Sequence, residues 1–319
     1  MNDKVLTISI AAYNSETYIR KCLDSVLKCK NYDKLEVLVI DDGGTDETLN
    51  IAKEYAKIYP SIVVPAHKEN GGWGSTVNYS INNATGKYMK ILDADDEFYT
   101  SNLDKYIDFL EENNDDLILT PYIERNIINN KSKFVEDKPL QMHSFTVKVE
   151  LLKKNGIKLT EKCFYTDIEY VFLALGVAKS ISNYNKCIYV YNVGYEGQSV
   201  NNKQFVKHID EHETVCKNVI SIYNNISNES LCINKEIVFN RLVELIYKHY
   251  SVLYMLNINN ETLRRIIAFD NYIKNDTDLY ESIKLIRVRA LRINKYLYYP
   301  VASFLHFRSK IYSLIKGSK

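Results

Sequence analysis

Acidic side chains gather in one short stretch of this sequence, directly after an apolar run. Asp93, Asp95, Asp96 and Glu97 follow the strand-like residues 88–92. Carboxylates this close repel one another unless a cation neutralises them. Hard divalent ions such as Mg²⁺ and Mn²⁺ prefer oxygen ligands, and they are often held by one or two carboxylates together with substrate phosphates. The stretch therefore predicts a metal–diphosphate site, with a solvated acidic turn as the alternative.

The elements that must position these carboxylates alternate between strands and helices. Residues 5–12 and 35–40 are continuous apolar runs, a pattern typical of parallel strands buried on both faces. Each run leads into a segment with helical spacing of apolar residues, and a third strand is expected at 62–65. This order predicts an α/β fold with a right-handed, mostly parallel sheet. Such sheets bind ligands at the carboxyl ends of their strands, where the acidic stretch lies.

Strands and helices are also expected along the rest of the first 210 residues. The apolar pattern weakens over 126–139, which indicates strands or loops at a sheet edge. A second acidic pair, Asp167 and Glu169, opens the apolar segment 164–175, where carboxylates in a first turn would stabilise a helix. Further helices are expected at 75–84, 103–110 and 149–154, and further strands at 87–92, 117–122 and 187–192.

Beyond about residue 208 the pattern becomes helical throughout, so we expect a domain of residues 1–210 followed by a helical region of residues 211–319. From residue 282 to the end there is no Asp or Glu, while Lys and Arg recur among Leu, Tyr and Phe. A basic, aromatic-rich amphipathic tail is attracted to an anionic membrane surface. A helix pair with a solvated basic face is the alternative.

Composition excludes several classes of protein. The 319 residues carry a formal net charge of +1, so there is no global field of the kind that binds nucleic acid, and we expect no nucleic-acid partner. Six cysteines show no Cys-x-x-Cys spacing and no secretory leader is visible, which favours free thiols in the cytoplasm. No window is apolar for long enough to span a bilayer.

Four motifs, taken in their order and spacing, resemble the family 2 glycosyltransferases over about residues 5–200. Those enzymes have the GT-A fold, use nucleotide-diphosphate sugars and invert the anomeric centre. The closest resemblance is to bacterial enzymes that build capsular, exopolysaccharide or teichoic-type polymers. The motifs are residues 11–14, 41–46, 70–78 and the Asp-x-Asp-type run 93–96.

The resemblance implies a donor site. Tyr13 would stack on a uracil ring, although a core tyrosine is the alternative among 26 tyrosines. Asp41 and Asp42 would accept from a uracil N–H or a ribose hydroxyl, with capping of the next helix as their competing role. Asp93 would contact the ribose, and Asp95 would bind the Mn²⁺ or Mg²⁺ that bridges the phosphates. The expected donor-binding set is Ala12, Tyr13, Asp41, Asp42, Asn70, Asp93, Ala94 and Asp95.

The resemblance also implies an acceptor side. Asp167 matches the position of the catalytic base, which would take the proton of the attacking hydroxyl. The chain departs from the family pattern in two places: Trp73 stands where relatives often have histidine, and no arginine precedes Gln198. The expected acceptor-binding or supporting residues are Asp96, His143, Glu169 and Gln198.

The sequence thus predicts an inverting, metal-dependent glycosyltransferase that uses a UDP-sugar and acts at the inner face of the cell membrane. Its acceptor would be a glycan or a lipid-linked precursor. The processive Gln-x-x-Arg-Trp pattern is absent, which favours transfer of single sugars. Two alternatives are a sugar-phosphate nucleotidyltransferase and a non-catalytic carbohydrate- or membrane-binding relative. The first needs a glycine-rich basic loop after the first strand, and residues 11–14 do not provide one.

Overall fold

The structure, a computed structural model, describes residues 4–136, 140–195, 202–226 and 233–317. It forms two compact units. Unit 1 comprises Met1–Gln198 and Asn218–Lys235, and unit 2 comprises Ser199–Lys217 and Glu236–Lys319. The division falls inside helix α8 (Ile209–Asn225), whose first turn contains the expected boundary at residue 210.

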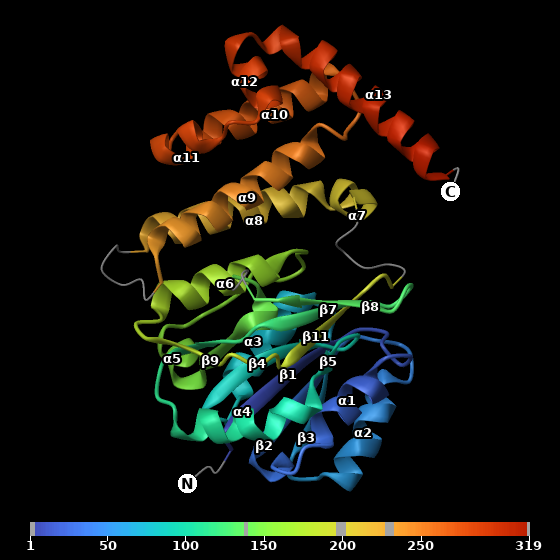
Figure 1. The fold of residues 1–319 in the computed structure, drawn as a ribbon, viewed down its shortest axis with the longest axis vertical. Helices are drawn as coiled ribbons and strands as arrows, with labels where there is room; N and C mark the ends of the chain where they lie inside the picture. The colour runs from blue at the N-terminus through green and yellow to red at the C-terminus, as the bar shows by residue number, and fades with distance from the viewer. Residues whose placement is uncertain (1–3, 137–139, 196–201, 227–232, 318–319) are drawn as a thin grey trace. The chain divides into compact units, whose positions relative to one another are not determined.

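Unit 1 is built around a seven-stranded sheet (Figure 1). Its strands are β1 (Leu6–Ala12), β2 (Leu35–Asp42), β3 (Val63–Lys68), β4 (Tyr88–Asp93), β6 (Leu117–Leu119), β9 (Phe145–Lys148) and β10 (Ile181–Asn183). The strand order is β10-β6-β9-β4-β1-β2-β3. Strand β1 pairs in parallel with β2 and β4, β2 pairs in parallel with β3, and β9 runs antiparallel to β4 and β6. The predicted α/β class with a mostly parallel sheet is confirmed.

Helices flank the strands of this sheet. They are α1 (Ile19–Leu27), α2 (Thr48–Ile58), α3 (Trp73–Asn83), α4 (Thr100–Glu112), α5 (Val149–Lys154) and α6 (Thr166–Val177), with short 3-10 turns at Tyr32–Lys34 and Met142–Ser144. Helix α3 packs against β1, β2, α5 and α6, whereas α1 packs against α2 and α4. The helical spacing of Ile19, Cys22, Leu23 and Val26 places these side chains on one face of α1, as predicted. All four are fully buried.

A second, smaller sheet completes unit 1. It contains β5 (Glu97–Phe98), β7 (Tyr122–Asn126), β8 (Lys131–Val135) and β11 (Tyr189–Val193) in the order β5-β11-β7-β8. The prediction of one strand over 117–122 was wrong, because this segment divides between β6 in the large sheet and β7 in the small one. Pro121 lies at the break, and proline has no N–H to continue a strand ladder. Strand β8 lies at a sheet edge, as expected for the described part of 126–139.

The C-terminal region is helical, as predicted. Its helices are α7 (Asn202–Lys207), α8, α9 (Lys235–Leu253), α10 (Asn260–Ile273), α11 (Thr277–Ser282), α12 (Ile286–Ile293) and α13 (Tyr298–Gly317), with a 3-10 turn at Lys295–Leu297. Within unit 2, Asp270 accepts from the Tyr250 hydroxyl at 2.5 Å and pairs with the Arg292 guanidinium at 2.8 Å, which joins α9, α10 and α12. No helix in the described ranges has the length and apolarity needed to cross a membrane.

Lys90 is a fully buried lysine in the middle of β4. Its Nζ donates to the carbonyl oxygens of His143 at 2.7 Å and Phe145 at 3.2 Å. Burial lowers the pKa of this amine to about 7. These two hydrogen bonds hold β4 to the 142–145 segment, and a neutral amine has the two N–H donors that they require.

We expect Lys90 to make the free energy of unfolding rise with pH between about 7 and 10.5. In this window the unfolded chain binds the lysine proton and the folded chain does not, so one group contributes at most about 1.4 kcal/mol per pH unit. Urea unfolding of the wild type and Lys90→Met at about pH 7.5 and about pH 9.5 isolates this contribution. A stability difference between the two proteins that stays constant with pH contradicts the assignment.

Candidate active site

The carboxyl ends of three parallel strands meet at one edge of the large sheet. Ala12 at the end of β1 lies opposite Asp41 of β2, and Ala11 lies opposite Asp93 of β4. The chain then turns at Tyr13, which is 56% exposed. The register therefore brings four of the expected donor-binding residues, Ala12, Tyr13, Asp41 and Asp93, to the same edge.

Asp93 is held by the indole of Trp73, the first residue of α3. Trp73 Nε1 donates to Asp93 Oδ1 at 2.7 Å. Burial raises the pKa of Asp93 to about 7, and the charges of Asp95 and Asp167 act in the same direction, whereas the Trp73 hydrogen bond lowers it. The sequence contains a single tryptophan, and its place in the glycine-rich loop was the signal that could have marked it as a site residue.

We expect Trp73→Phe to lower the free energy of unfolding by about 1–3 kcal/mol, because the substitution keeps an aromatic ring but removes the donor to a buried carboxylate. Urea denaturation at about pH 8, where Asp93 is ionised, measures this cost. In an Asp93→Asn background the cost of Trp73→Phe should shrink, since the amide carries no charge to stabilise. An equal cost in both backgrounds contradicts the role given to the indole.

The turn after β4 gives its aspartates different surroundings. Asp96 is 1% exposed, and it accepts from the Tyr189 hydroxyl at 2.6 Å and from the Asn192 N–H at 2.7 Å. Both oxygens therefore accept hydrogen bonds within the protein and anchor β11, which fits the supporting one of the two roles expected for Asp96. Ala94 is buried, whereas Asp95 stays partly exposed.

Asp41 is buried at the end of β2 and lies beside His67 of β3. Asp41 Oδ2 is 2.6 Å from His67 Nδ1, and the Gly44 N–H donates to Asp41 Oδ1 at 3.2 Å. The side chain of His67 is 51% exposed. Sequence reasoning did not select His67, because only the pairing of β2 with β3 places it opposite Asp41.

Asp42 organises the glycine-rich loop before α3. Its Oδ1 accepts from Lys68 Nζ at 2.8 Å and from the Gly71 N–H at 3.0 Å, and its Oδ2 accepts from the Gly72 N–H at 2.7 Å. The Asn70 amide donates to the Asp42 carbonyl at 2.8 Å. Gly72 has a φ of +78°, a conformation that side chains rarely adopt. Asp42 and Asn70 therefore fix the shape of the loop.

Asp167 lies in the first turn of α6, after Tyr165 with its left-handed φ of 67°. The charge of Asp167 raises the pKa of Asp93 and of the Tyr191 hydroxyl, and the charge of Asp95 acts on the same two groups. The carboxylates of the β4 turn and of α6 thus lie within electrostatic range of one another, although they come from distant parts of the chain.

Gly74 allows the beginnings of α3 and α6 to approach closely. A Cβ at this position would lie 2.3 Å from the Thr160 carbonyl oxygen and 3.2 Å from Thr166 Oγ1. Trp73 precedes Gly74 and holds Asp93, while Thr166 precedes Asp167. A residue without a side chain is therefore needed where the segment that holds Asp93 and the segment that bears Asp167 come together.

Three remaining expectations concern the acceptor side. Glu169 is 2% exposed and accepts from the Thr160 N–H at 3.0 Å and the Asn218 amide at 2.8 Å, so it supports the 160 loop. His143 is buried against the Tyr191 ring at 4.4 Å, and burial lowers its pKa to about 3. Its role in binding stays a prediction. Gln198 lies outside the described residues.

Asp93 and Asp95 offer oxygen ligands that suit a hard divalent ion. Burial and, after it, the charge of Asp95 raise the pKa of Asp93, and a bound cation would relieve this repulsion between the two carboxylates. Across the described ranges, no third His, Cys, Asp or Glu completes a metal-binding cluster with this pair. Mg²⁺ in proteins is usually held by one or two carboxylates together with substrate phosphates and water.

The sequence was compared with family models and curated proteins. Residues 7–165 match the model of glycosyl transferase family 2, a range that includes Asp41, Asp93 and Asp95 and ends just before Asp167. The chain is 28% identical over 253 residues to the minor teichoic acid biosynthesis protein GgaB of Bacillus subtilis. That alignment covers 70% of this chain and 28% of GgaB, so the chain spans little more than a quarter of this relative's length.

Solved structures show the same fold. S. aureus TarS 1-349 in complex with UDP-GlcNAc matches with a TM-score of 0.67 at 19% identity, over 98% of this chain and 92% of that chain. The mannosyltransferase PcManGT from Pyrobaculum calidifontis, in complex with GDP-Man and Mn²⁺, matches with a TM-score of 0.51 at 15% identity, over 78% and 73% of the two chains. The predicted GT-A-type fold, with its C-terminal helices, is confirmed.

Proposed function

Because the chain belongs to glycosyl transferase family 2, we propose that it transfers a sugar from a UDP-sugar, with inversion, to a hydroxyl of a cell-surface glycan or its lipid-linked precursor. One observation carries this proposal: the charges of Asp95 and Asp167 act on the same two groups, the Asp93 carboxyl and the Tyr191 hydroxyl. A cation-binding carboxylate and a proton-accepting carboxylate beside one site are what an in-line sugar transfer requires.

The donor nucleotide is assigned to the ends of β1 and β2. The exposed ring of Tyr13 offers an aromatic face to a flat uracil base. Asp41, which is buried and already holds the Gly44 turn, positions the half-exposed His67 ring beside it. The UDP-GlcNAc complex of TarS, which has the same fold, supports a uridine nucleotide.

The metal is assigned to Asp95, with Asp93 toward the ribose. Both are partly exposed carboxylates in the β4 turn, and the Mn²⁺ complex of PcManGT supports a divalent ion in this fold. When bound, Mn²⁺ or Mg²⁺ supplies Lewis-acid stabilisation of the negative charge on the departing diphosphate. Trp73 orients the Asp93 carboxylate through its indole N–H.

Asp167 is assigned as the general base. The acceptor oxygen attacks the anomeric carbon as its proton passes to the Asp167 carboxylate. The bond between the anomeric carbon and the diphosphate oxygen breaks at the same time, and its electron pair leaves with the diphosphate. Attack from the side opposite the leaving group inverts the anomeric centre. The first turn of α6 favours the ionised form of this carboxylate.

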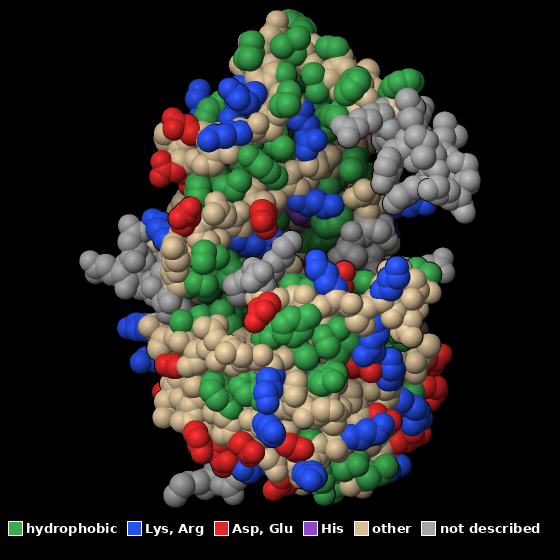
Figure 2. Space-filling model, viewed as in Figure 1, with side chains coloured by type: hydrophobic (Ala, Val, Ile, Leu, Met, Phe, Trp, Pro, Cys, Tyr) green, Lys and Arg blue, Asp and Glu red, His purple; other side chains and the backbone are tan. Residues whose placement is uncertain are grey.

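The acceptor is assigned to the cytoplasmic membrane face. GgaB, by its name, takes part in minor teichoic acid biosynthesis, which supports a surface polymer or its precursor. In the basic C-terminal segment, Ile286, Ile293, Tyr296 and Phe304 are each more than 60% exposed, and Figure 2 shows hydrophobic side chains at the surface near α12. Binding to anionic but not neutral vesicles in co-sedimentation supports a membrane role for this surface, and binding to neither contradicts it.

A donor screen by thermal shift tests the proposed function. A ligand that binds only the folded state raises the melting temperature. We expect one or more UDP-sugars to raise it with Mn²⁺ and not with EDTA, and GDP-sugars to have a smaller effect. Tyr13→Ala should reduce the shift, whereas Tyr32→Ala, which removes an exposed tyrosine at the opposite end of β2, should not. No shift and no nucleotide release with any sugar nucleotide contradict the proposal.

A further inference from the structure

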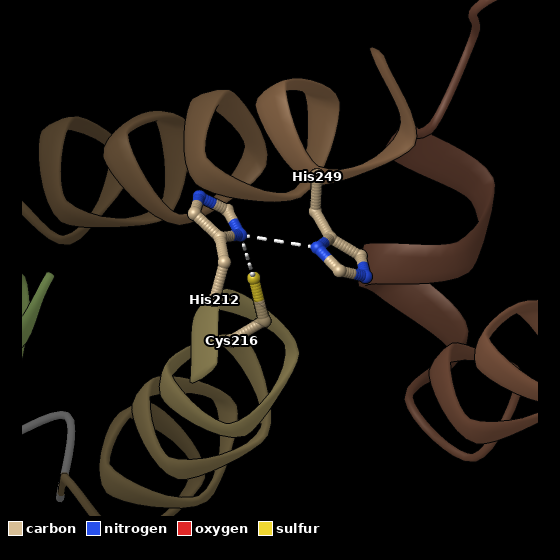
Figure 3. Close-up of side chains that lie close together, drawn as sticks. All are labelled: His212, Cys216 and His249. Carbon is tan, nitrogen blue, oxygen red and sulfur yellow. Dashed lines mark hydrogen bonds between the residues drawn. The ribbon is translucent and has the colours of Figure 1, made fainter. Parts of the chain in front are cut away.

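The part of α8 that belongs to unit 2 and helix α9 place two histidines and a cysteine together in the interior of this unit (Figure 3). His212 and Cys216 lie one turn apart on α8, and His249 lies on α9. All three are at most 1% exposed. His212 Nδ1 lies 3.0 Å from His249 Nδ1 and 3.5 Å from Cys216 Sγ, and the three candidate ligand atoms all lie within 4.8 Å of one another. Imidazole and thiolate are the ligand types that zinc prefers.

These separations resemble those between the ligands of a tetrahedral zinc ion. Zinc–nitrogen bonds of about 2.0–2.1 Å and zinc–sulfur bonds of about 2.3 Å separate two nitrogens by about 3.3 Å and nitrogen from sulfur by about 3.6 Å. The observed 3.0 Å and 3.5 Å are close to these values. Side chains four residues apart share a helix face, so α8 presents His212 and Cys216 together toward His249.

The other ring nitrogen of His249 faces a carboxylate. His249 Nε2 lies 3.8 Å from Glu213 Oε2, and it has no hydrogen-bond partner among the residues that the structure describes. Glu213 is itself held by Arg265 at 3.0 Å and Lys217 at 2.8 Å. A metal-bound histidine almost always donates its second ring N–H to a carboxylate, carbonyl or water. Glu213 is therefore placed to position His249 as a ligand.

Binding of a metal would displace the proton of the Cys216 thiol, because the thiolate is the form that binds metal. A metal-free, hydrogen-bonded core cluster is the competing interpretation.

We propose that His212, Cys216 and His249 form a zinc site that ties α8 to α9. A thiolate with two imidazoles selects Zn²⁺ over Mg²⁺ and Mn²⁺, so the site differs in chemistry from the carboxylate pair in unit 1. Three protein ligands would leave one position of a tetrahedral zinc ion for a further ligand. The burial of all three side chains favours a structural role, because the ion would crosslink two helices.

Cobalt binding to the whole chain tests the site. Protein stripped with EDTA is titrated with Co²⁺ in the presence of excess Mg²⁺, which occupies the carboxylate pair. We expect one equivalent of Co²⁺ to bind with a thiolate-to-cobalt charge-transfer absorption, and Zn²⁺ to displace it. We also expect added Zn²⁺ to raise the melting temperature of the stripped protein. A wild type that shows no such absorption with excess Co²⁺ overturns the proposal.

Variants separate a true site from adventitious binding. Cys216→Ala should remove the charge-transfer absorption, and His249→Ala should weaken Co²⁺ binding by at least about 100-fold. Glu213→Gln should keep the absorption and weaken binding by about 10–100-fold, as a positioning residue does. Cys29→Ala, at a buried cysteine of unit 1, is the matched control and should bind as the wild type does. A charge-transfer absorption that survives Cys216→Ala overturns the assignment. If the ligand variants fail to fold, the Co²⁺ affinity of Glu213→Gln decides, because this variant keeps all three ligands, and an affinity equal to that of the wild type contradicts the proposed site.

Discussion

The Asp167→Asn variant is expected to lose turnover by ~10²–10⁴-fold while it binds the donor as the wild type does. The amide keeps the size of the side chain and its place in the first turn of α6, but it does not accept a proton at neutral pH. Donor affinity should not change, because Asp167 is assigned to the acceptor hydroxyl. A coupled assay for released UDP measures turnover, and calorimetry measures donor affinity.

Asp278→Asn provides the matched control for this variant. Asp278 is an exposed carboxylate in the first turn of α11, so its replacement removes a helix-dipole interaction of the same kind. Such an interaction stabilises a helix by only about 0.3–1 kcal/mol, and its loss should leave turnover unchanged. If Asp167→Asn keeps wild-type turnover, or loses activity only in proportion to unfolded protein, Asp167 serves the helix and is not the base.

Asp95→Ala is expected to abolish the Mn²⁺-dependent rise in melting temperature with donor and to lower kcat/KM by at least about 100-fold. A metal ion contributes several kcal/mol of charge stabilisation in the transition state, and each 1.36 kcal/mol corresponds to a factor of ten in rate. Thermal shift with donor, at a series of Mn²⁺ concentrations, measures the change in metal-supported binding.

The control for Asp95→Ala is Asp33→Ala. Asp33 is an exposed aspartate in the 3-10 turn before β2, at the opposite end of that strand from the site. Its loss should change neither the Mn²⁺ dependence nor kcat/KM. Donor binding that still requires Mn²⁺ in Asp95→Ala would mean that other residues hold the ion, and the assignment of Asp95 would then be wrong.

The fold class could be read from sequence because it follows from local patterns. Buried parallel strands appear as unbroken apolar runs, and β1 and β2 coincide with two such runs. The small sheet was harder to predict, because its strands are short and pair with partners far away in the chain. Strand β11 pairs with β7 and β5, and no local pattern specifies that pairing.

The sequence predicted where in the fold the candidate site lies, but not the hydrogen bonds that its carboxylates make. Spacing showed that Asp41, Asp93 and Asp95 follow strands, and the register places Asp41 and Asp93 at one edge of the sheet. Spacing could not show which oxygens the protein already uses. Asp96 and Glu169 have both oxygens in hydrogen bonds, which depend on tertiary contacts with β11 and the 160 loop.

Residues that sequence reasoning missed owe their place to tertiary contacts. Trp73 reaches Asp93 because α3 begins beside the end of β4, and His67 reaches Asp41 because β2 pairs with β3. His212 and Cys216 have helical spacing, but their partner His249 lies on another helix. A spacing of four residues between one histidine and one cysteine carries too little information to predict that third side chain.

The stereochemistry of the product tests the central claim most directly, because that claim places the proton acceptor across the sugar from the diphosphate. The wild type is incubated with Mn²⁺, an α-linked UDP-sugar identified by the donor screen and an accepting hydroxyl, and the new linkage is assigned by NMR from its anomeric coupling. We predict a β-linked product, formed by a single displacement with Asp167 as base. An α-linked product would contradict the account.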